Sequence, residues 1–379
     1  MDEHPDLESL APYQDKDVRP VLNELRKHQP FLNMLRFVDT EASQESLLQL
    51  IDSVDTIRDF QTKVVKPWLR HFFRQSIDEL TCSGIETLKP GQTHLYISNH
   101  RDIILDSAIL NLLLSDHGLP TAEIAIGDNL LKSGMVRAIT RLNKIFTVVR
   151  DAPPREMYRH SRLLSAYIRD RVTNGKTSVW LAQREGRAKD GNDTTQQGLL
   201  KMLHLSNEGS FEEGFRALRI RPMSLSYEYD PCDRFKLREL LAKAEGRPYD
   251  KKENEDYLNI ETGIIGYKGR VHLSVQPELQ EEIGRLAAIS NVNDKAAGLA
   301  AAIDHSIYRS YRLFDNNYAA CDLLHGTAQW QGHYSQEKKQ EFLAYVDKLC
   351  RGYSPKAREI LLRKYAYPVV NRQQGEGRP

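Results

Sequence analysis

The sequence predicts an α/β fold: a largely parallel or mixed sheet flanked by helices, with helical additions at both ends of the chain. Three observations support this class. Short apolar runs typical of strands appear between residues 94 and 275. Helical patterns lie between these runs, and alternating strands and helices are typical of α/β domains. Before and after this part of the chain, apolar residues recur at helical spacing alone.

The elements follow in order. Residues from about 16 to 80 are expected to be helical, because VRPVLNELRKHQPFLNMLRFV and SLLQLIDSVDTIRDF both show helical periodicity. Strands are expected at 94–99, 122–127, 144–149, 177–182, 218–228 and 270–275, and helices at 105–116, 130–143, 155–173, 195–205 and 234–245. From about residue 278 the pattern is helical again. This divides the chain into an N-terminal helical region (1–88), an α/β domain (89–277) and a C-terminal helical region (278–379).

Composition excludes several classes of protein. The 53 Lys and Arg residues nearly balance 52 Asp and Glu residues, and this net charge of +1 argues against a dedicated nucleic-acid binder. Four widely spaced cysteines predict reduced thiols rather than a zinc site or disulfide frame. The start MDEHPDLESLAP is too acidic and polar for a secretory signal, and 18 apolar residues never run together. We expect a cytoplasmic location, free or peripheral on the inner face of the cytoplasmic membrane.

Ligands of open α/β sheets gather where strands end, so the strand exits are the places to look for chemistry. At the first exit, Asn99, His100 and Arg101 precede two aspartates, Asp102 and Asp106. An imidazole beside a carboxylate is the arrangement of a general base. The alternative is that Asn99 caps a helix and Asp102 interacts with its dipole.

The second and third exits carry cations. Gly127 and Asn129 allow a turn, and Arg150 closes the next strand, either to bind phosphate or to form a surface ion pair. In QREGRAKDGND (183–193), Gly186 and Gly191 bracket Arg187 and Lys189, so backbone amides and two cations can approach one anion. The alternative for that segment is a solvated loop.

At the fourth exit, IRPMSLSYEYD contains Pro222, which predicts an edge position or a strand start and a segment lining an acyl or acceptor cleft.

The His-Arg-Asp triplet at the first exit also occurs in protein kinases. A kinase needs an asparagine five residues after that aspartate, and Ser107 stands there. Gly-rich and Asp-Phe-Gly segments are missing as well, which excludes the kinase interpretation.

Four segments resemble, in this order, the four blocks of the glycerolipid acyltransferase superfamily, over roughly residues 90 to 275. They are NHRDIILD, GDNLL with FTVVR, REGRAKDG and IRPMSLSYE. The arrangement looks closer to the glycerol-3-phosphate branch and to bacterial members with a helical C-terminal extension. One departure concerns spacing, since the family encloses four residues between histidine and aspartate and this chain encloses five. Either a later helix start lets Asp106 reach His100, or Asp102 orients the ring. The anion block also has only one glycine before Arg187.

The resemblance implies the α/β fold of glycerol-phosphate acyltransferases and direct acyl transfer with His100 as general base, oriented by Asp106 or Asp102. It implies a phosphate site at Arg150, Arg187, Lys189 and Gly186, and a cleft lined by Asn99, Gly127, Asn129 and Pro222. Neither cofactor nor metal is expected. The donor would be acyl-CoA or acyl-carrier protein, and the acceptor glycerol-3-phosphate or 1-acylglycerol-3-phosphate, in phospholipid synthesis. Alternatives are another lysolipid or an amino-lipid as acceptor, or a non-catalytic acyl-lipid-binding protein.

A membrane surface is a further expected partner. VVKPWLRHFFRQS (64–76) mixes aromatic and basic residues, a composition that suits an interfacial helix. The alternative, which we favour, is that this helix packs its aromatic side chains against the α/β domain.

Overall fold

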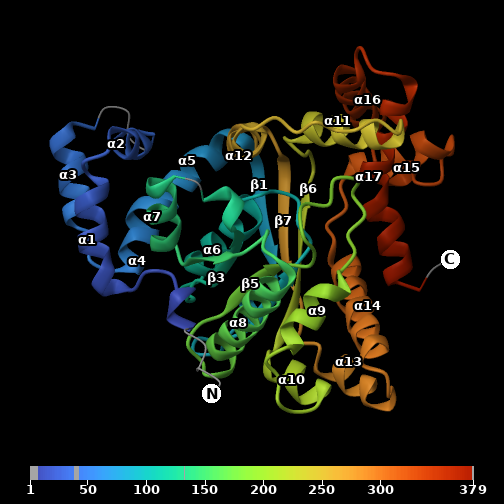
Figure 1. Ribbon diagram of the computed structural model, residues 1–379. Coiled ribbons are helices and arrows are strands. Elements are labelled where there is room, and N and C mark those ends of the chain that lie inside the picture. Colours follow the sequence, from blue (N-terminus) through green and yellow to red (C-terminus); the bar gives the residue numbers. More distant parts are fainter. Residues whose placement is uncertain (1–6, 38–41, 132, 378–379) are drawn as a thin grey trace.

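The computed structural model describes residues 7–37, 42–131 and 133–377, and within these ranges seven strands form one sheet (Figure 1). The strand order is β1-β7-β6-β2-β5-β3-β4. β6 and β7 pair antiparallel, while all other neighbours pair parallel. The strands are β1 (Ile77–Ser83), β2 (Leu95–Ser98), β3 (Glu123–Gly127), β4 (Ile145–Val148), β5 (Val179–Ala182), β6 (Ile220–Tyr227) and β7 (Gly269–Val275). The mixed α/β fold class is confirmed.

Helices precede, separate and follow the strands, as the sequence predicts. The first group is α1 (Asp15–Leu25), α2 (Gln29–Arg36), α3 (Gln44–Asp52), α4 (Ile57–Asp59) and α5 (Lys66–Ser76), with a π-helical segment, Phe60–Val65, between the last two. Between strands lie α6 (Leu105–Asp116), α7 (Gly134–Leu142), α8 (Pro154–Thr173), α9 (Gln197–His204), α10 (Phe211–Ala217), α11 (Asp233–Ala244) and α12 (Glu255–Ile265). The last group is α13 (Gln280–Arg285), α14 (Val292–Ser310), α15 (Asp315–His325), α16 (Gln336–Cys350) and α17 (Pro355–Gly375).

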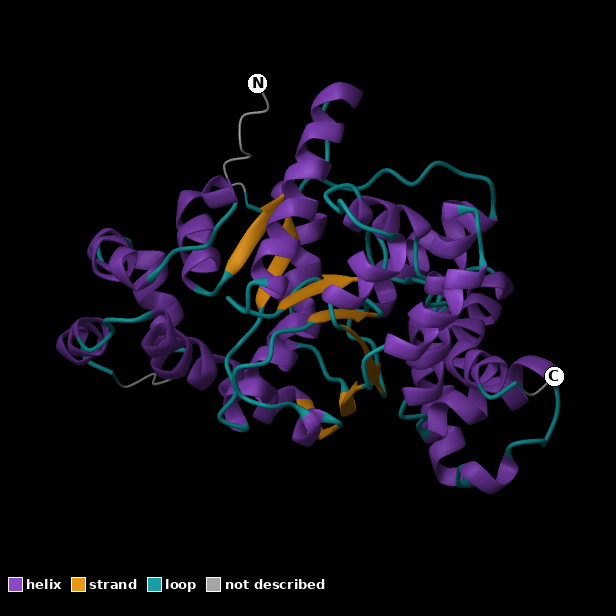
Figure 2. Cartoon of the chain, turned by 90° about the horizontal axis from the view of Figure 1, so that it is seen from below, coloured by secondary structure: helices purple, strands orange, loops and turns teal. Residues whose placement is uncertain are grey.

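The sheet is the middle layer of three, with helices on both faces (Figure 2). Side chains of a strand alternate between faces, and β2 shows the result. Leu95 and Ile97 belong to a core that includes residues of α8, α9, α10 and α14. Tyr96 belongs to the opposite core, which includes residues of α5 and α6. Both faces are therefore apolar, which explains the continuous hydrophobic runs in the inner strands.

The two helical groups at the ends of the chain have cores of their own. Helices α1 to α3 and the π-helical segment share one apolar cluster with Leu142 of α7. Helices α15, α16 and α17 share another. In Figure 1 these groups lie on opposite sides of the sheet. The central layers are thus held between two helical units.

The structure corrects two expectations, and for the segment 64–76 it selects one of the two alternatives. Residues 77–83, expected to be helical, form β1 at the edge of the sheet. Pro222 is buried in an inner strand, so the edge position is wrong; it lies near the strand start, before the pairing with β7 begins at Met223. In α5, Phe72 and Phe73 are buried, which is the packed alternative for this segment. Residues 1–6 of the acidic N-terminal stretch lie outside the described residues.

Candidate active site

His100 follows the carboxyl end of β2, and its partner is Asp106 in the first turn of α6. The His100 Nδ1 atom lies 2.9 Å from Asp106 Oδ2. A carboxylate only accepts hydrogen bonds, so the Nδ1 atom carries the ring hydrogen and donates a hydrogen bond to Asp106. This tautomer leaves Nε2 with the lone pair that a general base needs. The side chain of His100 is 14% exposed, whereas that of Asp106 is fully buried.

Three further donors hold the Asp106 carboxylate in place. The backbone N–H groups of Arg101 and Asp102 donate to Oδ2 at 2.6 and 3.0 Å. The Tyr227 hydroxyl at the end of β6 donates to Oδ1 at 2.9 Å. Because these groups come from two strand ends, the orientation of the carboxylate does not depend on one flexible side chain. Burial, and then the charge of Asp106, raise the pKa of the Tyr227 hydroxyl well above its ordinary value.

Asp102 has a different position from Asp106. Its Oδ1 accepts from the backbone N–H groups of Ile104 and Leu105, both at 2.9 Å, at the start of α6. This position at the start of α6 agrees with the helix-dipole alternative that the sequence left open for Asp102, whereas the capping role considered for Asn99 is not seen. Burial, and then the charge of Asp106, raise its pKa. Because α6 begins at Leu105, the five-residue spacing still lets Asp106 reach His100.

The loop after β5, residues 183–193, packs directly against the histidine block. The Ala188 N–H donates to the His100 carbonyl at 2.9 Å. At the end of the loop, Asp193 accepts from Arg101 Nη2 at 2.6 Å and from Asn99 Nδ2 at 3.1 Å. Burial raises the pKa of the Asp193 carboxyl, and Arg101 opposes this rise. The first and third strand exits therefore form one structural unit.

Asn99 is fully buried and is occupied by backbone contacts. Its side-chain amide donates to the Leu225 carbonyl at 3.0 Å and accepts from the Leu225 N–H at 2.8 Å. These bonds join β2 to β6. Asn99 and the buried Pro222 therefore lie inside the sheet rather than on the open wall expected for a cleft.

Gly127, Asn129 and Arg150 meet at the second exit. A Cβ atom at Gly127 would lie 2.5 Å from Asn129 Oδ1 and 2.8 Å from Arg150 Nε, so a larger residue there would require these two side chains to move. Arg150 Nη1 lies 2.9 Å from Glu185 Oε1 in the loop after β5. The structure thus brings the second and third exits together, through the ion-pair alternative for Arg150.

The other two cations of the predicted phosphate site also have protein partners. Arg187 Nη1 donates to Asn259 Oδ1 of α12 at 3.1 Å. Lys189 pairs with Glu239 of α11. Arg187 alone among the three cations faces an uncharged amide. Its charge lowers the pKa of the Asp102 carboxyl, which opposes the rise caused by burial. Gly186 is exposed and has a φ of +70°.

Sequence reasoning missed two residues of this site. The fourth exit was expected only to line a cleft, yet it supplies Tyr227 to Asp106. Asp193 was quoted only as the end of a charged loop, yet it joins Arg101, Asn99 and the Tyr311 hydroxyl, the last at 2.5 Å. Tyr227 ends β6 and Asp193 lies in the loop after β5, both at the edge of the sheet that carries His100. This position at strand ends was the sequence signal that could have identified them as site residues.

Part of the chain is similar to known proteins. The family model described as Acyltransferase matches residues 79–210, a range that contains His100, Asp106, Arg150 and Arg187. A search of curated proteins finds no match. Among solved structures, the 1-acyl-sn-glycerophosphate (LPA) acyltransferase PlsC from Thermotoga maritima matches at 13% identity with a TM-score of 0.37, over 76% of this chain and 98% of that chain. The family match therefore makes residues 79–210 of this chain similar to the Acyltransferase family.

Proposed function

We propose that the chain transfers a fatty acyl group from a thioester donor to a hydroxyl of glycerol-3-phosphate or 1-acylglycerol-3-phosphate, in phospholipid synthesis. The observation that carries this proposal is the His100–Asp106 pair at 2.9 Å, with three further donors on the aspartate. A buried, fully bonded carboxylate behind a partly exposed imidazole is the arrangement that general-base catalysis requires. A site that only bound acyl lipid would have no need of it.

In the proposed reaction, His100 Nε2 takes the proton of the acceptor hydroxyl as its oxygen attacks the thioester carbonyl. The imidazolium formed is stabilised by Asp106, as in other histidine–carboxylate pairs. When the tetrahedral intermediate collapses, the C–S bond breaks and the thiol leaves with the proton from His100. The acyl group passes directly to the acceptor, and this sequence of steps needs no cofactor.

The acceptor phosphate would be held by Arg150, Arg187 and Lys189, with the Gly186 backbone alongside. Arg150 and Lys189 are paired with Glu185 and Glu239, so an incoming phosphate would displace these carboxylates. Arg187 has only an amide partner and is the cation on which we expect binding to depend most. Positioning of this kind contributes on the order of 7 kcal/mol to catalysis when the geometry is good.

We also propose that the protein works in the cytoplasm at a membrane surface. No helix in the described part of the chain is long and apolar enough to span a bilayer. Tyr257, Ile265 and Tyr267, on α12 and just after it, are 70%, 55% and 53% exposed. The same helix contributes Asn259, the partner of Arg187, so this apolar surface adjoins the candidate site. It would let the site reach a lipid acceptor without a membrane span.

The test is acceptor-dependent thiol release from palmitoyl-CoA and from palmitoyl-carrier protein, with glycerol-3-phosphate or 1-acylglycerol-3-phosphate added. We expect His100→Ala to lower the rate by about 10²- to 10⁴-fold, the usual contribution of a general base. His325→Ala, at an exposed position at the end of α15, is the matched control and should keep the wild-type rate. An active His100→Ala variant would remove the base role. A wild-type protein inactive with both acceptors would remove the acceptor assignment.

A further inference from the structure

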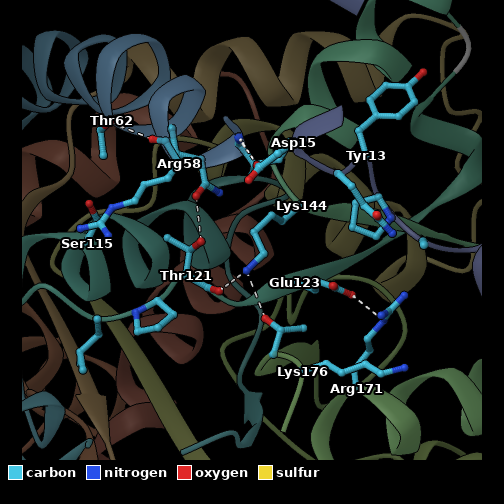
Figure 3. A pocket seen from close by; sticks show the side chains of 18 of the residues that line it. Tyr13, Asp15, Arg58, Thr62, Ser115, Thr121, Glu123, Lys144, Arg171 and Lys176 are labelled. Atoms are coloured by element: carbon cyan, nitrogen blue, oxygen red, sulfur yellow. Dashed lines mark hydrogen bonds and ion pairs between the residues drawn. The ribbon is translucent and has the colours of Figure 1, made fainter. Parts of the chain in front are cut away.

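A cavity of about 480 Å³ (Figure 3) lies at the amino ends of β3, β4 and β5, whereas His100 follows the carboxyl end of the parallel strand β2. Its floor is formed by residues that precede three strands: Thr121 and Glu123 at β3, Lys144 at β4 and Thr177 at β5. The amino ends of these parallel strands are on the edge away from the candidate active site. The volume falls in the range of about 300 to 1,000 Å³ that small-molecule sites occupy.

The N-terminal helical region forms the other wall of this cavity. The lining includes residues 11–15 at and before the start of α1, and Ile57, Arg58, Gln61 and Thr62 of α4 and the π-helical segment. Gln61 accepts a hydrogen bond from Thr121 at 2.8 Å across the cavity wall. The cavity is therefore an interface between two parts of the chain that have separate apolar cores. A molecule bound there would contact both parts.

Cations outnumber carboxylates in the lining. Four cations, Arg58, Lys144, Arg171 and Lys176, face two carboxylates, Asp15 and Glu123. Lys176 is neutralised by Asp170, at 2.8 Å, and Asp15 is occupied by the Ile57 N–H, also at 2.8 Å. Asp15 keeps its charge, because a backbone N–H does not neutralise a carboxylate, and Arg171 faces the carboxylates of both Glu8 and Glu123. Within the described residues, the lining cations without an ion pair are Lys144 and, at the rim, Arg58.

Lys144 carries a charge without a counterion within the described ranges. Its ammonium donates to the Thr121 carbonyl at 2.6 Å and to the Thr177 hydroxyl at 3.1 Å, and no carboxylate oxygen lies within 4.0 Å of it. Figure 3 shows the Lys144 side chain extending toward Thr121. The backbone of Lys144 has a φ of +60°, a conformation that side-chain-bearing residues adopt at a cost of about 1 to 3 kcal/mol and that clusters at ligand sites.

Arg171 is incompletely satisfied. It is 9% exposed, and its Nε atom is buried without a hydrogen-bond partner in the described part of the chain. Two carboxylates lie near its guanidinium without meeting Nε at hydrogen-bond distance: Glu8 Oε1 is 3.6 Å from Nη2, and Glu123 Oε2 is 3.8 Å from Nε. Glu123 Oε2 already accepts a hydrogen bond from the Tyr167 hydroxyl at 2.5 Å. A buried polar atom left without a partner is costly unless a ligand supplies one.

We propose that this cavity is a second binding site, for a small organic phosphate, and that the ligand joins the N-terminal helices to the sheet. The phosphate would neutralise Lys144, accept from the Arg171 guanidinium and lie within reach of Arg58. The Lys144 and Arg58 cations, which have no ion pair within the described residues, suit an anion, and arginine donors suit the oxygens of a phosphate. This site is separate from the proposed acyl-transfer site and does not depend on it.

The test measures binding of inorganic phosphate, with pyrophosphate as a larger probe, by calorimetry at constant ionic strength. We expect Lys144→Met to weaken binding at least tenfold. Arg58→Gln, at an exposed helix position that should not disturb folding, is expected to weaken it several-fold. Arg187→Gln distinguishes the two sites, because it lies in the candidate acyl-transfer site and should leave binding in this cavity unchanged.

Hydrogen exchange gives a second readout in the wild-type protein. Phosphate should slow exchange of the backbone amides of residues 11–15 and of α4, which line the cavity. The proposal is overturned if wild type binds neither probe. It is also overturned if Arg187→Gln removes the binding while Lys144→Met and Arg58→Gln keep it, because the phosphate would then lie at the acyl-transfer site. A lipid-headgroup ligand would show instead as protection by phosphatidic acid vesicles and none by the soluble probes.

Discussion

At the scale of single residues, the two aspartates after His100 have separate tasks. Asp106 contacts the imidazole, while Asp102 caps the start of α6. Asn at position 106 would no longer provide a charge to stabilise the imidazolium. Asn at position 102 still offers an oxygen to the Ile104 and Leu105 N–H groups, and it removes a buried charge next to Asp106.

We therefore expect Asp106→Asn to lower kcat by about 10²-fold or more, and Asp102→Asn to stay within about threefold of wild type. The thiol-release assay measures both, and urea unfolding checks that each variant is folded. Equal losses of kcat in the two variants would contradict this division of roles and would mean that Asp102 also takes part in the reaction.

Asp304 of α14 provides a residue-scale prediction of pH dependence. Its Oδ1 accepts from Thr195 N and Oγ1 at 2.8 and 2.6 Å, and burial raises its pKa to about 6. Between the ordinary pKa of about 4 and this value, the folded protein binds more protons than the unfolded chain. Stability contributed by this group is therefore lost as the pH rises through that window.

Asp304→Asn keeps the acceptor for Thr195 without the titration. We expect its free energy of unfolding to fall less steeply than that of wild type between pH 4 and pH 6, by up to about 1.4 kcal/mol per pH unit. Urea unfolding at a series of pH values measures both slopes. Parallel curves for the two proteins would show that Asp304 does not titrate in this range.

At the scale of elements, the loop after β5 depends on close contact with α17. Gly191 has a φ of +83°, and a Cβ atom there would lie 2.2 Å from the Lys364 carbonyl oxygen. Gly186 in the same loop has a φ of +70° with open space around it. The two glycines thus share backbone strain and differ in packing.

Gly191→Ala should destabilise the protein by about 1 to 3 kcal/mol more than Gly186→Ala, because only the first adds a steric clash. Denaturant unfolding of the two variants gives the difference directly. If both cost the same, the loop can move away from α17 and the contact has little energetic weight.

At the scale of the whole molecule, a buried group of charges joins the C-terminal helices to the α/β domain. Lys364 of α17 pairs with Asp233 and, at 2.6 Å, with Asp230. Asp230 also pairs with Lys236 of α11 at 2.5 Å, and Lys236 donates to the Arg101 carbonyl at 2.6 Å. Against burial, which would raise it, Lys236 and Lys364 lower the pKa of Asp230. The stability that Asp230 contributes is therefore present at neutral pH and lost in strong acid.

Lys364→Met leaves the buried Asp233 without its cation, and we expect a loss of about 3 to 5 kcal/mol. Lys348→Met, at an exposed position of α16, is the control and should change stability by less than about 0.5 kcal/mol. Denaturant unfolding compares them, and hydrogen exchange should show faster exchange in α15 to α17. An unchanged Lys364→Met variant would mean that apolar packing alone holds these helices.

Local pattern in the sequence was sufficient for six of the seven strands, because inner strands that are buried on both faces are continuous apolar runs. β1 escaped prediction. Its residues, IDELTCS, are partly exposed at the sheet edge, and only pairing with β7, almost 200 positions away, makes them a strand. The order of the strand-exit blocks likewise carried the family resemblance, and the family model described as Acyltransferase matches three of these blocks within residues 79–210.

The sequence by itself determined the layered fold, the position of His100 at a strand end and the general class of chemistry. Only the tertiary structure decided which aspartate meets the histidine, that Tyr227 joins them across 121 positions, and that the predicted cations have protein partners. It also formed the second cavity from segments of the N-terminal helices and from strand starts of the α/β domain that are far apart in the sequence. Periodicity reports on burial of neighbouring residues, whereas a site depends on contacts between strand ends, and these exist only after the sheet has formed.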